Sequence, residues 1–131
     1  MNEIVLFDSW AWWEVLEETP AGRVLSERYL EARRVRVLTV DYTLAEVAAK
    51  LARIDRAQDI EGALDAISTA DMVPITSEIA ALAATLQVEL RRENGDASVG
   101  DAVMLAAARL HGAILISGDP CYAGQRDVRT S

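Results

Sequence analysis

Four acidic residues stand where the sequence predicts strands to end or helices to begin. Asp8 and Asp119 each follow a short apolar run, Asp101 lies in the first turn of an expected helix, and Glu46 lies early in another. Ligands of open α/β sheets bind beyond the carboxyl ends of the strands. If the strands before Asp8 and Asp119 are parallel, these carboxylates meet at one edge of a sheet.

A group of carboxylates defines a particular chemistry. Like charges repel, so the group is unstable unless a cation lies among them. Ligands that are all oxygens favour the hard ions Mg²⁺ or Mn²⁺. Two such ions about 4 Å apart activate a water and stabilise the leaving oxygen of a phosphodiester. Metals then attract the substrate in place of Lys and Arg, so an acidic protein with this group can be a nuclease.

Each acid also has a structural interpretation. Asp8 and Asp119 are of a type common in turns and helix caps. Asp101 completes the capping-box-like pattern Ser98-x-x-Asp101, and Glu46 suits a solvated helix surface. The functional interpretation is favoured because four separate element ends direct an acid to one edge, with no basic residue beside them in sequence.

Short apolar runs without alternation predict strands covered on both faces, as in a parallel sheet. The clearest runs are Ile4–Phe7, Val35–Leu38 and Ala113–Ile116. A weaker run at Met72–Ile75 contains Pro74, which confines it to an edge or a strand end. Val128 is expected in a last short edge strand.

Helical patterns fill the segments between these strands. Apolar residues at i, i+3, i+4 and i+7 predict helices over 44–51 and 79–90, the second capped by Ser77. Further helices are expected after a cap at Ser9 and over Ala21–Arg33, Ala57–Ile67 and 98–109. Strands that alternate with helices predict an α/β sandwich, and we expect residues 1–131 to form one domain.

The ordered acidic motifs resemble those of a known family. They are Phe7-Asp8-Ser9, Ala45-Glu46-Val47, Ser98-x-x-Asp101 and Ser117-Gly118-Asp119. Together they resemble the motifs of PIN domains, and among these the VapC-type toxins of type II (VapBC) toxin–antitoxin modules. The resemblance covers nearly the whole chain. It implies a three-layer PIN-like sandwich with a central, mostly parallel sheet of four or five strands flanked by helices.

The resemblance also implies an activity. PIN toxins of this type are Mg²⁺- or Mn²⁺-dependent endoribonucleases that hydrolyse RNA by metal-activated water. By position, Asp8, Glu46, Asp101 and Asp119 would bind the metal, and Ser117 would position a ligand or water. The family further implies a homodimer, a VapB-like antitoxin as partner, and higher-order toxin–antitoxin complexes.

One position departs from the family pattern. Many relatives carry a further acid two residues after the last aspartate of the set, where this chain has Cys121, followed by the usual aromatic residue in Tyr122. Without this acid, a second metal site would have fewer ligands. The sequence is therefore compatible with a single metal ion in the resting protein. A thiolate is a poor ligand for Mg²⁺, so we interpret Cys121 as a small turn or core residue.

Three tryptophans follow the first acid, at positions 10, 12 and 13. Trp10 and Trp13 fall near one helix face and Trp12 nearly opposite, so we expect two to pack inward and one to be partly exposed. The alternative is that an exposed ring anchors the antitoxin or a dimer partner.

The clusters 33–36 and 91–92 are interpreted as solvated arginines, and His111 as a helix-end residue.

Composition excludes several classes. The 131 residues are 51% hydrophobic, which is too apolar for a disordered chain, and charges interrupt every apolar run before a membrane-spanning length of about 18 residues. One cysteine and one histidine exclude an internal disulfide and a Cys- or His-rich metal site. With no basic leader at the start, we expect a cytoplasmic protein. A net charge of −8 argues against non-specific coating of DNA.

Other functions fit less well. A phosphoacceptor signalling domain needs an acidic pair near its start and a late lysine, but the chain offers only Glu3 before Asp8 and no lysine after Ala113. A haloacid-dehalogenase-like phosphatase would need an aspartate where Trp10 stands. A catalytically silent interaction domain with this fold remains an alternative, which metal binding would distinguish.

Overall fold

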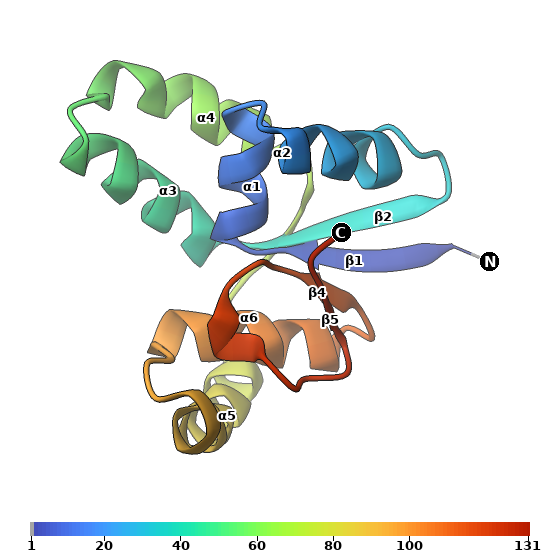
Figure 1. Cartoon of the computed structure of the whole chain (residues 1–131), viewed down its shortest axis with the longest axis vertical. Helices are drawn as coiled ribbons and strands as arrows, with labels where there is room; N and C mark the ends of the chain where they lie inside the picture. The colour runs from blue at the N-terminus through green and yellow to red at the C-terminus, as the bar shows by residue number, and fades with distance from the viewer. Residues whose placement is uncertain (1) are drawn as a thin grey trace.

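A computed structural model of the chain describes residues 2–131. Five parallel strands form one sheet in the order β3-β2-β1-β4-β5 (Figure 1). Their bounds are β1 Glu3–Phe7, β2 Val35–Val40, β3 Asp71–Val73, β4 Ile114–Ile116 and β5 Val128–Arg129. The predicted α/β class and the predicted mostly parallel sheet of four or five strands are therefore confirmed, and the sheet has five strands that are all parallel. The two weaker strands lie at the edges as expected, and β3 ends at Val73, before Pro74, which has no N–H to donate.

Helices and helical turns connect the strands. They are α1 Ser9–Leu16, α2 Pro20–Leu25, the π-turn η1 Ser26–Leu30, α3 Tyr42–Arg53, the 3₁₀ turn η2 Ala57–Asp59, α4 Ile60–Ile67, α5 Ser77–Asn94, α6 Val99–Leu110 and the 3₁₀ turn η3 Pro120–Tyr122. The prediction of one helix over Ala21–Arg33 was wrong in detail. Helix α2 begins with Pro20 as its first residue after a Thr19 cap, and the helical path ends in η1 at Leu30. None of these helices is both long and apolar enough to cross a membrane.

Two predicted helix caps were wrong by one residue. The cap of α1 is Asp8, whose carboxylate accepts a hydrogen bond from the Ala11 amide, and Ser9 is already helical. The cap of α5 is Thr76, which has an extended backbone and accepts from the Ile79 amide. In both cases the residue that keeps non-helical backbone angles caps the helix. His111 ends α6, as predicted.

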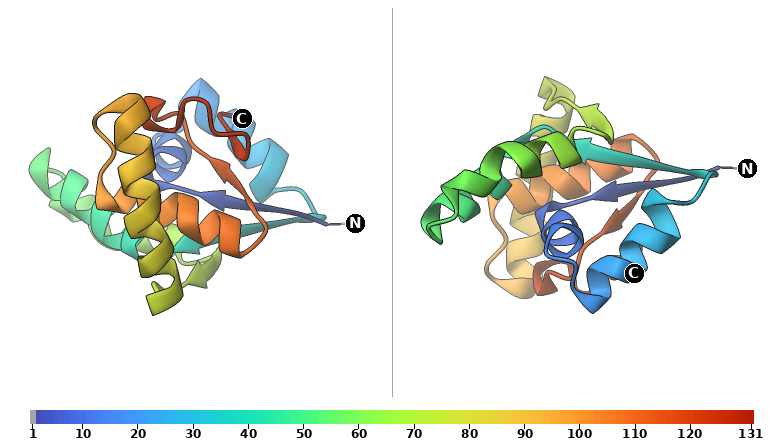
Figure 2. Two further views of the ribbon diagram at one scale, coloured as in Figure 1. Left: turned by 90° about the horizontal axis from the view of Figure 1, so that it is seen from below. Right: turned by 90° about the horizontal axis from the view of Figure 1, so that it is seen from above.

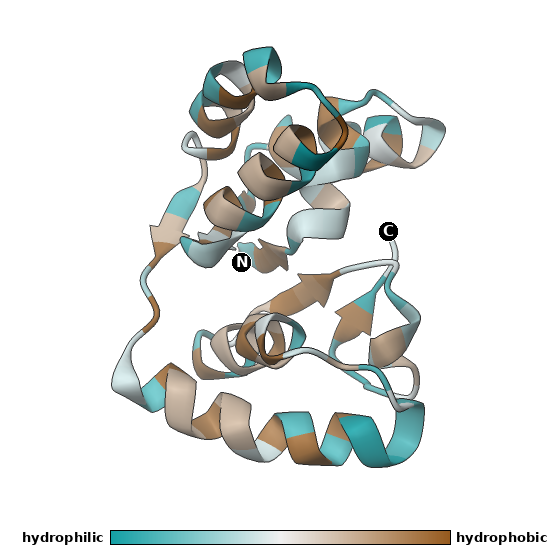
Figure 3. Cartoon of the chain, turned by 90° about the vertical axis from the view of Figure 1, so that its left-hand side faces the viewer, coloured by the Kyte–Doolittle hydropathy of each residue, from teal (hydrophilic) through white to brown (hydrophobic). Residues whose placement is uncertain are grey.

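The sheet separates two cores. Alternate residues of β1 point to opposite faces: Leu6 packs with α5 and α6, whereas Val5 and Phe7 pack with α1, η1 and α3. Helices α1–α4 cover one face and α5–α6 the other, which gives three layers (Figures 1 and 2). The strands in Figure 3 are mostly brown, hydrophobic, with some teal segments, whereas the C-terminal end of α5 is largely teal, hydrophilic.

Only one of the three tryptophans is fully buried. Trp12 is 2% exposed, stacks edge-on against Phe7 and donates from Nε1 to the Thr39 hydroxyl at 2.8 Å. Trp10 and Trp13 are both half-buried, so the expectation of two inward rings and one partly exposed ring was wrong. The reason is that α1 presents one face to the core, and only position 12 lies at the centre of that face.

Candidate metal centre

The carboxyl ends of β1 and β4 form the edge at which the candidate site lies. From β1 the chain continues to β2 and β3 on one side, and it later crosses to β4 on the other side of β1. Such a change of direction opens a crevice beyond the strand ends. Because β1 and β4 are adjacent and parallel, Asp8 and the segment 117–119 emerge at the same edge (Figure 1).

Asp8 is the most buried of the four acids, with 5% of its surface exposed. Its carboxylate caps α1 through the Ala11 amide at 2.9 Å, so the structural and functional interpretations of this residue are compatible. Burial raises the pKa of Asp8 to about 7, because desolvation disfavours the charged form. The Ser117 hydroxyl and the Ala11 amide lower this pKa, and the negative charges of Glu46 and Asp119 raise it.

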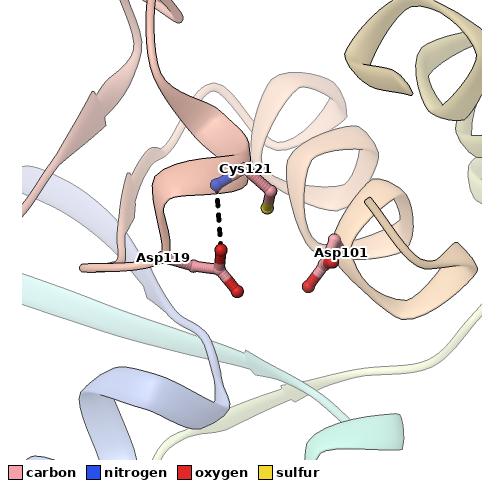
Figure 4. A group of neighbouring side chains, drawn as sticks. All are labelled: Asp101, Asp119 and Cys121. Atoms are coloured by element: carbon pink, nitrogen blue, oxygen red, sulfur yellow. Dashed lines mark hydrogen bonds between the residues drawn. The ribbon is translucent and has the colours of Figure 1, made fainter. Parts of the chain in front are cut away.

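Asp101 and Asp119 face each other across the edge (Figure 4). One oxygen of each carboxylate and the Cys121 Sγ all lie within 4.8 Å of one another. Asp101 forms a reciprocal capping box with Ser98 at the start of α6, as the sequence pattern indicated. Asp119 accepts from the Cys121 amide at 2.9 Å. Local hydrogen bonds thus hold both carboxylates in place.

Glu46 completes the group from α3. It is half-buried, and its Oε1 is buried without a hydrogen-bond partner among residues 2–131, so a solvated surface charge is the wrong description. Burial raises its pKa to about 7, and the negative charge of Asp101 adds to the increase. A Cβ at Gly100 would lie 3.3 Å from Glu46 Oε2, so glycine at that position leaves room for the carboxylate.

No cation among residues 2–131 forms an ion pair with these four acids. Every ion pair between residues 2–131 involves other carboxylates, such as Arg109 with Asp127 and Arg36 with Asp71. A buried carboxylate oxygen without a partner, set among like charges, is the environment that a divalent cation would satisfy. The donor set of Asp8, Glu46, Asp101 and Asp119 therefore fits Mg²⁺ or Mn²⁺.

The turn after Asp119 supports the site with contacts that the sequence did not reveal. The Asn94 side chain donates to the Cys121 carbonyl at 2.9 Å, and the Tyr122 hydroxyl donates to the Asp101 carbonyl at 2.8 Å. Cys121 is buried in the turn η3, which confirms its prediction as a small turn or core residue. Burial and the charge of Asp101 raise the pKa of its thiol, so the thiol remains protonated at neutral pH.

Ser117 is buried directly before the Asp119 turn. Its hydroxyl accepts from the Asp119 backbone amide at 3.1 Å and lies beside the Asp8 carboxylate, so it links Asp8 to the backbone of the Asp119 turn. The predicted site residues are therefore all at this edge, and the five come from four different segments of the chain.

The chain belongs to the PIN domain family, whose family model matches residues 5–123. The match includes residues 5–7 of β1, the four acids and the turn η3.

Solved structures with the same fold cover nearly the whole chain. A toxin–antitoxin complex from Klebsiella pneumoniae has a TM-score of 0.72 and 23% identity over 95% of both chains. VapBC2 from Rickettsia felis, bound to a DNA fragment from its promoter, has a TM-score of 0.74 and 13% identity over 95% of both. VapC20 from Mycobacterium tuberculosis, a toxin that cleaves the sarcin–ricin loop, has a TM-score of 0.69 and 23% identity over 95% of this chain and 98% of its own. No curated protein matched the chain.

Proposed function

We propose that this protein is an Mg²⁺- or Mn²⁺-dependent endoribonuclease and the toxin of a type II toxin–antitoxin system. The observation that supports it best is the group of four carboxylates at the sheet edge. Within residues 2–131 this group has no cationic partner, and Glu46 Oε1 is buried without a hydrogen-bond partner. Membership of the PIN family and the likeness to VapBC structures support the same conclusion.

The four carboxylates share one part in this proposal, and Ser117 has another. Asp8, Glu46, Asp101 and Asp119 would hold the metal, which supplies an activated water and charge stabilisation at the phosphodiester when bound. Asp101 and Asp119 are held by the capping box and by the Cys121 amide, so they are preorganised as ligands. Ser117 orients the Asp119 turn and faces Asp8, where it can also position a ligand.

The partners of this proposal follow from the relatives. An RNA strand is the substrate, and a VapB-like antitoxin is the inhibitory partner, since the similar structures are toxin–antitoxin complexes. We include a homodimer and a higher-order complex with the antitoxin in the proposal, because the resemblance to VapC-type toxins implies both.

A cleavage assay with a matched variant tests the proposal. Purified protein is incubated with mixed RNA in Mn²⁺, in Mg²⁺ and in EDTA, and products are followed on a denaturing gel. We expect cleavage only with a divalent ion, and its loss in Asp8→Asn. Asparagine can still accept the Ala11 hydrogen bond, so the α1 cap is retained and the melting temperature reports whether the variant is folded.

Two results would contradict the proposal. Cleavage in EDTA at the rate seen with metal would exclude the metal mechanism. A wild-type protein that neither binds Mn²⁺ by calorimetry nor cleaves RNA would instead be a catalytically silent interaction domain.

A further inference from the structure

A groove of about 540 Å³ lies beside the four acids, between α1 and α3. Trp10 and Trp13 line it from α1, and Tyr42, Lys50 and Arg53 line it from α3. Glu46 lines the groove and also belongs to the acidic group. The groove therefore opens onto the candidate metal centre.

Two of the aromatic rings contact the backbone next to the acids. A Cβ at Gly118 would lie 2.5 Å from two ring carbons of Trp10, and a Cβ at Gly100 would lie 3.0 Å from a ring carbon of Tyr42. Each glycine directly precedes an aspartate of the site, Asp119 and Asp101. At Gly118 only a residue without a side chain allows this approach, and at Gly100 a Cβ would make a tight contact with Tyr42. The two rings therefore lie against the segments that carry these carboxylates.

The groove also carries the positive charge that the acidic group lacks. Lys50, the only lysine of the chain, holds its Nζ 3.9 Å from the centre of the Trp13 ring, a cation–π contact that orients the ammonium. Neither Lys50 nor Arg53 forms an ion pair with any carboxylate within residues 2–131. Glu46, Lys50 and Arg53 follow i, i+4 and i+7 spacing, so the cations lie roughly 6 and 10 Å along α3 from Glu46.

We propose that this groove binds the unpaired nucleotide next to the scissile phosphate of a single-stranded RNA. This inference rests on the proposed nuclease function. A base stacks on the exposed face of Tyr42 beside Trp10, and the adjoining phosphate binds Lys50 and Arg53. Aromatic faces combined with unpaired cations are the features that bind single-stranded nucleic acid.

Charge and shape favour this occupant. The protein has a net charge of −8, which repels a phosphate backbone over most of its surface. Lys50 and Arg53 of the groove offer favourable electrostatic contacts beside the metal centre. Tyr42 is 44% exposed although it is a large aromatic residue, so its face is accessible to a base. Bases in a duplex are already stacked on one another, so the groove selects unpaired strands.

Binding in EDTA tests the groove separately from cleavage. A fluorescein-labelled 12-nucleotide RNA without self-complementarity is titrated with the full chain, and anisotropy gives Kd at several salt concentrations. We expect Tyr42→Ala to weaken binding at least about fivefold, whereas Tyr42→Phe binds like the wild type. Lys50→Met and Arg53→Met are each expected to reduce the slope of log K against log salt by about 0.7.

Matched controls define the outcome. Arg92→Met, in an exposed residue of α5 outside the groove, should leave Kd and slope unchanged, and melting temperatures report folding. Arg53 is exposed, so its variant remains informative if Lys50→Met disturbs Trp13. Unchanged affinity in the Tyr42, Lys50 and Arg53 variants would overturn the inference and leave the groove for a protein partner, as would equal affinity for a duplex of the same sequence.

The result is distinct from a test of the nuclease itself. Groove-dependent RNA binding by a protein that never cleaves would support the groove and reject the proposed activity. Metal-dependent cleavage by a protein whose RNA affinity is unchanged in the Tyr42, Lys50 and Arg53 variants would support the proposed activity and reject the groove.

Discussion

Asp101 and Asp127 are two aspartates near opposite ends of helix α6, and they differ in whether a cation pairs with them. Asp127, just before β5, accepts a hydrogen bond from Arg109 Nε at 3.0 Å and is neutralised by it. Asp101, at the start of α6, faces Asp119 and Glu46 and has no cationic partner among residues 2–131. The first turn of α6 thus contains Asp101, which forms no ion pair within residues 2–131. The last turn contains Arg109, which pairs with Asp127.

The difference shows which carboxylates are structural and which are available for a ligand. A paired carboxylate contributes to folding and gains little from a further cation. A carboxylate that lies among like charges without a counter-ion costs free energy in the folded protein, and such costs persist mainly at functional sites. The predictions below test this contrast with the same type of substitution at both ends.

The largest expected effect is on cleavage. Asp101→Asn should reduce metal-dependent RNA cleavage at least about 100-fold, because a ligand charge is lost while the capping oxygen for Ser98 remains. Asp127→Asn should leave the cleavage rate within about twofold, since this residue lies outside the site. Initial rates in Mn²⁺ check both. Equal losses in the two variants would remove the distinction between the regions.

Metal should stabilise the fold through the unpaired acids. At a concentration of 100 times Kd, Mn²⁺ should raise the free energy of unfolding of the wild type by about 2.7 kcal/mol. Glu46→Gln should weaken Mn²⁺ binding at least about tenfold, because its carboxylate oxygen is no longer a charged ligand. Urea denaturation with and without Mn²⁺, together with calorimetry, measures both. An Asp127→Asn protein should respond to Mn²⁺ like the wild type.

Stability of the metal-free protein should depend on pH through Asp8 and Glu46. Their pKa values are about 7 in the folded protein and lie near 4 when unfolded, so between these values the folded state holds more protons. Stability from this source is greatest below pH 4 and decreases as pH rises to 7. In EDTA, we expect the melting temperature to fall between pH 5 and pH 8. Each kcal/mol lost from the free energy of unfolding should lower it by roughly 4 °C.

Asp8→Asn provides the control for that pH dependence. Asparagine does not titrate, so the variant should lose part of the decrease and be more stable than the wild type in EDTA at pH 8. A wild-type melting temperature that rises steadily from pH 5 to 8 would show that these carboxyls are not protonated in the folded protein.

The smallest expected effect is the loss of a paired carboxylate. Asp127→Asn should lower the free energy of unfolding by about 0.5 kcal/mol, because the Arg109 pair is partly solvated. Urea denaturation measures it, and 1 M salt should reduce the difference by screening. A cost above about 2 kcal/mol would mean that Asp127 has a larger structural role than the ion pair.

Much of the fold was predictable from local pattern. The apolar runs of β1 and β4 and the second half of β2 have no alternation, because both faces of these segments are covered, as is usual in a parallel sheet. The first half of β2 contains the exposed Arg36. The errors lie at element ends. Ser9 and Ser77 are good capping residues, but Asp8 and Thr76 cap instead, since the backbone path into each helix decides which residue is non-helical.

The acids of the site were predictable as a set, because each follows a strand or begins a helix and parallel strands bring such positions to one edge. Their electrostatics were not. Whether Glu46 is solvated or buried without a partner depends on α6 and on the space left by Gly100, which is distant in sequence. The groove of Trp10, Tyr42 and Lys50 was equally hidden, because it exists only where α1 packs beside α3.

Residue type and spacing therefore specify the strands, the helices and the identity of the acidic group, since these depend on neighbours within a few positions. Burial and charge balance depend on segments that are far apart in the sequence: Glu46 and Gly100 are separated by 54 residues, and Trp10 and Gly118 by 108. Only the tertiary fold brings such segments together, because desolvation and Coulomb energy follow distance in space and not distance along the chain.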